Sequence, residues 1–172
     1  MSNRLQKIIC DQLEESVRFR EARAFFASQE KWAAARGLFG SSFSLAMAGL
    51  AWDRSSPWLI VTAKADDAEE VYHNLIYHGL EGVYHYPRWD ILPYEDTEEP
   101  VAEIRAKQVE TLGALLDWRR GDRLDRPAPL IVAPYVALLQ KTLPPDYLSE
   151  HIVKLEFADA IQTANLANRL TA

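Results

Sequence analysis

A glycine- and serine-rich turn is the first place where this sequence could do chemistry. Residues 37–44 read Gly-Leu-Phe-Gly-Ser-Ser-Phe-Ser and lie in the register of a phosphate-binding loop, G-x-x-x-x-G-K-[ST]. Such a loop needs backbone N–H groups facing the phosphates, a lysine for the outer phosphates and a hydroxyl for Mg²⁺. Ser42 replaces the second glycine, Phe43 replaces the lysine, and Ser44 alone matches the pattern.

We interpret this turn as a degenerate phosphate loop, packed by Phe39 and Phe43, that binds no cofactor. Phe43 removes the positive charge and puts a ring where the terminal phosphates would lie. A nucleotide site that survives in weakened form is the alternative. The residues of the degenerate loop are Gly37, Gly40, Ser41, Ser42, Phe43 and Ser44.

A second distinctive stretch combines aromatic residues with prolines. Residues 86–94 read Tyr-Pro-Arg-Trp-Asp-Ile-Leu-Pro-Tyr and follow an expected strand at 83–86. The carboxyl ends of strands are the usual ligand side of an α/β sheet, and Trp89 or Tyr94 could stack on a base there. Because Arg88 stands alone among acids, we favour the interpretation that Trp89 and Leu92 hold the loop against the core.

The other reactive side chains form no catalytic or metal-binding pattern. Acids at the start of a helix usually form a solvated face that suits the helix dipole, although carboxylates could also hold Mg²⁺. We interpret Asp66, Asp67, Glu69 and Glu70 as such a solvated helix face. The acids at 95–99 are interpreted as a solvated linker that could attract a basic partner. The spacing of the histidines and the cysteine matches no zinc-binding motif and no nucleophile motif; these residues are His73, His78, His85, His151 and Cys10. We therefore expect no catalytic residue and no metal site.

Strands and helices alternate along the chain. Apolar runs predict buried strands at 58–62 and 130–133 and short strands at 32–38 and 83–86, and alternation predicts a half-exposed strand at 151–157. Helical patterns cover roughly the first 30 residues, 42–51, the stretch before Gly79, 101–118, 135–141 and 158–172. This order predicts an α/β fold, a parallel sheet with helices on both faces.

Composition restricts the class of protein. The chain has 172 residues, 48% of them hydrophobic and 26% charged, which excludes a disordered or collagen-like chain. The net charge of −6 argues against gripping nucleic acid through its phosphates alone. A single cysteine and the lack of a long apolar run predict a cytoplasmic protein without a membrane partner.

Three stretches together resemble one family: residues 37–41, 87–94 and 130–140. Through them, residues 30–172 resemble the N-terminal region of the bacterial transcription-repair coupling factor (Mfd), which is similar to the damage-recognition protein UvrB. The resemblance implies a P-loop NTPase-like (RecA-like) parallel sheet, incomplete and with a degenerate nucleotide site. It implies a UvrB-like first subdomain over 1–150 and the start of a UvrA-binding-type domain over 151–172. The family loop, structural or interdomain, comprises Pro87, Trp89, Asp90, Leu92, Pro93 and Tyr94.

The resemblance also implies a function. The chain would be a non-catalytic module that supports UvrA recruitment and restrains the motor through the remaining domains of the parent protein. ATP and Mg²⁺ would belong to that motor, and RNA polymerase and double-stranded DNA would be bound through domains absent here. A chain that stops near His151 would lack most of the UvrA surface and the returning strands of its sheet, which predicts an unfilled edge and self-association. The alternatives are an NTPase or helicase half with weak nucleotide binding, and a stand-alone adaptor.

Overall fold

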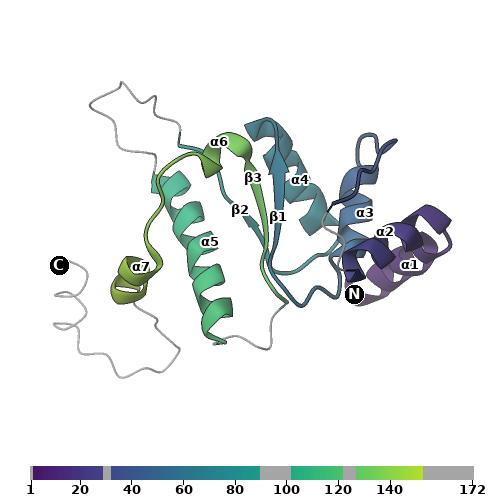
Figure 1. Ribbon diagram of the computed structural model, residues 1–172, viewed down its shortest axis with the longest axis horizontal. Coiled ribbons are helices and arrows are strands. Elements are labelled where there is room, and N and C mark those ends of the chain that lie inside the picture. The colour runs from purple at the N-terminus through teal and green to yellow at the C-terminus, as the bar shows by residue number, and fades with distance from the viewer. Residues whose placement is uncertain (1, 29–31, 90–101, 122–126, 153–172) are drawn as a thin grey trace. The chain divides into compact units, whose positions relative to one another are not determined.

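The computed structural model describes residues 2–28, 32–89, 102–121 and 127–152, with side chains from residue 8 onward (Figure 1). They fall into two compact units, Met1–Gln140 and Lys141–Ala172. The elements are α1 (Ser2–Glu14), α2 (Val17–Ala27), α3 (Ser42–Leu50), β1 (Trp58–Thr62), α4 (Ala65–Tyr77), β2 (Val83–His85), α5 (Ala102–Arg120), β3 (Leu130–Pro134), α6 (Tyr135–Leu138) and α7 (Pro145–His151). The sequence prediction of a first subdomain over 1–150 and a second domain from residue 151 stays a prediction.

A small parallel sheet forms the centre of the first unit. Its strand order is β1-β3-β2, and both pairings are parallel, with Ile60 and His85 each opposite Val132. Every residue of β3 is buried, as its continuous apolar sequence predicts for a central strand. The predicted α/β class with a parallel sheet is therefore confirmed.

Helices cover the two faces of this sheet. On one face, Ile60, Leu130 and Val132 pack with Ala68 and Leu75 of α4. On the other face, Ile131 and Ala133 pack with Leu112 and Leu115 of α5. Figure 1 shows α4 and α5 on opposite sides of the strands.

The strand predicted at 32–38 is wrong. Residues 32–39 form no regular structure and are exposed throughout. Three consecutive alanines make this a poor strand sequence, and no described strand lies beside it to complete a ladder. The degenerate phosphate loop is therefore preceded by irregular chain instead of a strand.

The ends of the chain also differ from the sequence predictions. Residues 2–27 form two helices, α1 and α2, because Ser16 caps α2 by accepting a hydrogen bond from the Phe19 N–H. In the second unit, α7 begins at Pro145, a residue that the first turn of a helix tolerates, so His151 is helical and not the start of a strand. The rest of that predicted strand and the helix predicted at 158–172 lie outside the described residues.

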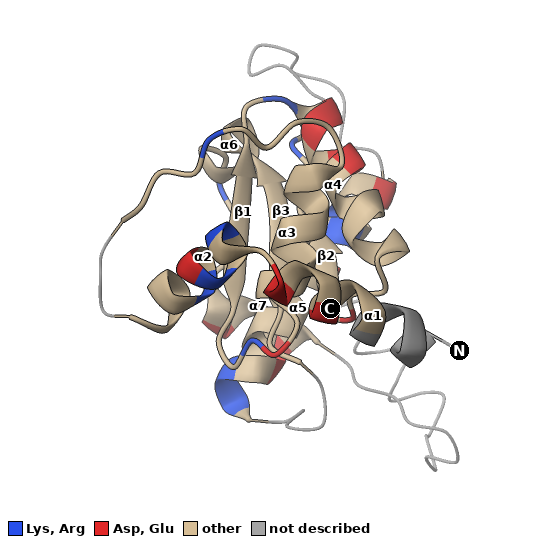
Figure 2. Cartoon of the chain, turned by 90° about the vertical axis from the view of Figure 1, so that its right-hand side faces the viewer, with Lys and Arg blue, Asp and Glu red and all other residues tan. Residues whose placement is uncertain are grey.

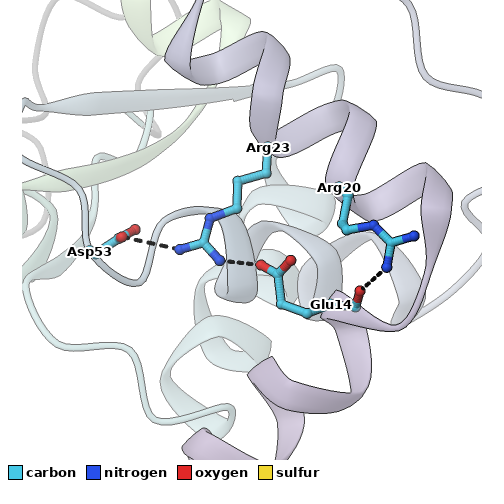
Figure 3. Close-up of polar contacts among 4 residues, drawn as sticks. All are labelled: Glu14, Arg20, Arg23 and Asp53. Atoms are coloured by element: carbon cyan, nitrogen blue, oxygen red, sulfur yellow. Dashed lines mark hydrogen bonds and ion pairs between the residues drawn. The ribbon is translucent and has the colours of Figure 1, made fainter.

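The α1–α2 hairpin packs on α3 through a glycine. A Cβ atom on Gly49 would lie 2.5 Å from Leu13 and 2.9 Å from Phe19, so glycine allows this close approach. Arg23 of α2 bonds the Glu14 carboxylate and lies 3.1 Å from the Asp53 carboxylate, as Figure 3 shows. This ion-pair chain ties the hairpin to the turn that leads into β1.

Candidate functional site at the carboxyl edge of the sheet

Both motifs singled out in the sequence lie at the carboxyl edge of the sheet. The aromatic segment at 86–89 directly follows β2. The chain passes from the end of α3 into the start of β1, and Arg54 in this connection binds carbonyls just before β2 and β3. Since α3 ends at the amino edge of the strands, its first residue, Ser42, lies toward the carboxyl edge, where α/β sheets usually bind ligands.

The degenerate phosphate loop uses its own polar groups internally. Ser42 Oγ accepts a hydrogen bond from the Phe39 N–H at 2.8 Å and donates one to the Phe39 carbonyl at 2.7 Å. The Ser42 N–H also donates to that carbonyl, at 3.2 Å. Gly37 and Gly40 have φ values of 84° and 54°, a conformation that glycine adopts without strain. Two backbone N–H groups of the turn, those of Phe39 and Ser42, are therefore already bonded within it.

The two phenylalanines of this turn behave differently. Phe43, at the lysine position of the pattern, packs against the core cluster of Ile60, Leu75 and Val132. Phe39 is 83% exposed, so the prediction that it packs the turn is wrong. Ser44, at the hydroxyl position, is buried. The turn therefore presents an exposed ring, and no lysine is present within it.

The aromatic segment is fastened by two glutamines. The Trp89 indole N–H donates to Gln108 Oε1 at 3.0 Å, and Gln108 Nε2 donates to the Pro87 carbonyl at 2.9 Å. The Trp89 backbone N–H donates to Gln140 Oε1 at 2.8 Å. Gln108 is buried, so this amide bridges α5 and the segment inside the protein. These bonds support the interpretation that Trp89 holds its segment against the protein, while the part predicted for Leu92 stays a prediction.

The other residues of the family loop are Asp90, Leu92, Pro93 and Tyr94, and they lie outside the described residues. Sequence reasoning quoted Gln140 within the 130–140 stretch but gave it no role, and it missed Gln108 altogether. A buried glutamine on a helix leaves little signal in the sequence, because its bonding partners are 19 and 21 residues away.

Sequence reasoning also missed a buried guanidinium at the amino edge. Arg54 is 7% exposed and donates to the carbonyls of Ala51, Ala128, Glu81 and Gly82 at 2.6–3.2 Å. Burial lowers the pKa of Arg54 to about 10. The side chain joins the end of α3 to the starts of β2 and β3, so its role is to hold the scaffold together.

The acids of α4 remain on the surface. Asp66, Asp67, Glu69 and Glu70 are all exposed, and Figure 2 shows acidic residues gathered at α4. Glu69 lies 3.7 Å from His73 on the same helix. Within the described ranges, no group of histidine, cysteine, aspartate and glutamate residues could hold a metal ion.

The remaining reactive residues are scattered. His78 follows the last turn of α4, and His151 of α7 stacks on Tyr147 with ring centroids 4.0 Å apart. Cys10 lies in α1, and burial raises the pKa of its thiol. In the part of the chain that the structure describes, no helix has the length and apolar character needed to cross a membrane.

His85 makes the stability of the fold depend on pH. Its ring stacks on Tyr72 with centroids 5.5 Å apart, and its Nε2 atom is buried without a hydrogen-bond partner among the described residues. Burial lowers the pKa of His85, with a smaller contribution from the charge of Lys107. Between that lowered pKa and 6.5, the unfolded chain binds more protons than the folded chain, so stability falls as the pH drops below about 6.5.

We expect His85→Phe to reduce this acid sensitivity. The ring stack is kept while the titrating group is removed, and one proton accounts for at most about 1.4 kcal/mol per pH unit. Urea denaturation at pH 7.5, 6.5 and 5.5 measures the slope, with exposed His73→Phe as the matched control. An equal loss of stability in all three proteins between pH 6.5 and 5.5 would contradict this role.

Comparison with known proteins finds similarity to transcription-repair-coupling factors. Over 99 residues, 57% of this chain, the sequence is 28% identical to the transcription-repair-coupling factor of Rickettsia bellii (strain RML369-C). The same length is 26% identical to that of Rickettsia prowazekii (strain Madrid E). The chain is similar to part of a transcription-repair-coupling factor. It spans about 8% of the length of these relatives.

No protein-family model matches the chain, and no solved structure matches it. The similarity to transcription-repair-coupling factors thus agrees with the resemblance carried by the three sequence stretches. The P-loop NTPase-like form of the fold remains a prediction, because the sheet has three strands within the described residues and residues 32–36, just before the Gly37–Ser44 turn, form no strand.

Proposed function

We propose that this chain is a non-catalytic scaffold module in transcription-coupled DNA repair, forming part of a transcription-repair coupling factor. The observation that carries the proposal is the similarity to two such factors over 57% of the chain. The turn at residues 37–44 supports the non-catalytic part, because Ser42 closes it internally and Phe43 packs into the core where a lysine would be needed.

The module acts through protein contacts. The segment from Pro87 to Trp89 is fixed by Gln108 and Gln140, which suits a surface that other domains of the parent protein recognise. The exposed acids of α4 repel phosphates, which disfavours binding of double-stranded DNA by this module. RNA polymerase and DNA are bound through other domains of the parent protein. In the parent protein, the module supports recruitment of UvrA and restrains the ATP-driven translocase.

Adding the chain in trans to a translocase tests this proposal. A transcription-repair coupling factor that lacks its own corresponding region would be mixed with increasing amounts of this chain. We expect DNA-stimulated ATP hydrolysis to fall with concentration and to saturate, because the restraining contacts are restored.

An unrelated folded protein with the same net charge controls for competition with DNA. A hydrolysis rate that stays constant up to concentrations at which the chain binds the translocase would contradict restraint. Hydrolysis by the chain alone would instead favour the NTPase alternative.

A further inference from the structure

β2 is a short strand that leads directly into the aromatic segment. It has three residues, Val83–His85, and its pairing with β3 ends where the Tyr86 N–H donates to the Val132 carbonyl at 2.9 Å. The segment from Pro87 to Trp89 follows without a break. A strand held by so few backbone bonds belongs to the part of a fold that can open locally.

His85 connects this strand to helices on both faces of the sheet. Toward α4, its ring stacks on Tyr72 with centroids 5.5 Å apart, and its Nε2 atom is buried without a hydrogen-bond partner among the described residues. Toward α5, the buried Thr111 places its Oγ1 atom 3.4 Å from the His85 carbonyl. Gln108, the amide that fastens the aromatic segment, lies three positions before Thr111 and so on the same side of α5.

The surroundings of His85 favour its neutral form. Burial is the main cause that lowers the pKa of this imidazole, and the charge of Lys107 on α5 adds to it. On α4, Glu69 acts in the opposite direction, whereas His73, 3.7 Å from the Glu69 carboxylate, acts like Lys107. β3 adds no charge, because the residue opposite His85 is Val132.

We propose that His85 is an acid-operated latch, whose protonation releases β2 and the Pro87–Trp89 segment while β1 and β3 stay paired. Protonation places a charged N–H at Nε2, a buried position that offers it no acceptor. The imidazolium therefore turns toward water, where the exposed carboxylate of Glu69 attracts it. This movement breaks the stack on Tyr72 and displaces the short strand that carries the ring.

The opening is local because the two pairings of β3 are separate. The β1–β3 register runs from Trp58–Leu130 to Thr62–Pro134 and contains no residue of β2. At neutral pH the ring is neutral and the segment stays bonded to Gln108. The latch goes beyond the effect of His85 on overall stability, since it names the part of the protein that opens first. It does not depend on the proposed repair function.

Nuclear magnetic resonance of the Trp89 indole N–H tests the latch, with Trp89→Phe used to assign the signal. Between about pH 7.5 and 5, we expect this signal to move toward that of a water-exposed indole, with the same midpoint as the His85 ring signal. Backbone signals of β1 should stay unchanged over that range. His85→Phe keeps an aromatic ring but does not titrate, so its Trp89 signal should not move. His73→Phe is the matched control and should behave like the wild type.

Two charge variants test the same coupling with His85 in place. Lys107→Gln removes a positive charge and should raise the midpoint of the Trp89 change, whereas Glu69→Gln should lower it. Each shift should be about 0.2–0.7 pH units, as expected for partly exposed charges. The proposal would be overturned by a constant Trp89 signal while His85 titrates, or by the same movement in His85→Phe. Loss of the β1 signals together with that of Trp89 would also overturn it, because the whole fold would then open at once.

Discussion

Arg54→Met is expected to lower the free energy of unfolding by about 3 kcal/mol or more. Methionine retains the apolar bulk of the side chain but removes the donors to the carbonyls of Ala51, Ala128, Glu81 and Gly82. Each buried carbonyl that loses its partner costs about 1–3 kcal/mol. Urea denaturation followed by circular dichroism measures the change.

Two further variants separate bonding from charge. Arg54→Lys keeps a charge but not the planar donor geometry that reaches several carbonyls at once, so it should lose a comparable amount. Arg18→Met is the matched control, because Arg18 is exposed and bonds Glu21 within one helix turn, and it should change stability by less than about 0.5 kcal/mol. A loss at Arg54 no greater than at Arg18 would show that the buried network contributes little.

Gln108→Leu is expected to cost about 2 kcal/mol and to release the aromatic segment. Leucine is similar in size but leaves the Trp89 indole N–H and the Pro87 carbonyl without their partner. The same denaturation measurement applies, and faster proteolysis within the segment would report its release. Exposed Gln12→Leu on α1 is the control and should leave stability nearly unchanged.

A double-mutant cycle isolates this contact. Trp89→Phe alone removes the indole donor, and combined with Gln108→Leu it should cost less than the sum of the two single changes. Additive losses would mean that the indole and the amide do not interact, and Trp89 would then hold the segment by ring packing alone.

The sequence predicts well those parts of the fold that depend on local pattern. The apolar runs at 58–62 and 130–133 form β1 and β3, and the helical pattern before Gly79 forms α4. The run at 32–38 failed because strand formation also needs a neighbouring strand, which local sequence does not reveal.

The polar contacts that hold the site were less accessible to sequence reasoning. Arg54 bonds a carbonyl 74 residues away, and Trp89 bonds Gln140 across 51 residues. Such contacts depend on the finished topology. The phosphate-loop pattern, in contrast, is a local motif, so the replacements at Ser42 and Phe43 were readable directly.

The most direct test of the central claim is a calorimetric titration of the chain with Mg-ATP. A non-catalytic scaffold predicts no saturable heat up to millimolar nucleotide. Phe43→Lys should bind no better, since Ser42 still bonds the Phe39 N–H and closes the turn. Saturable binding in the micromolar range by the unaltered chain would contradict the claim and would make the turn at residues 37–44 a working nucleotide site.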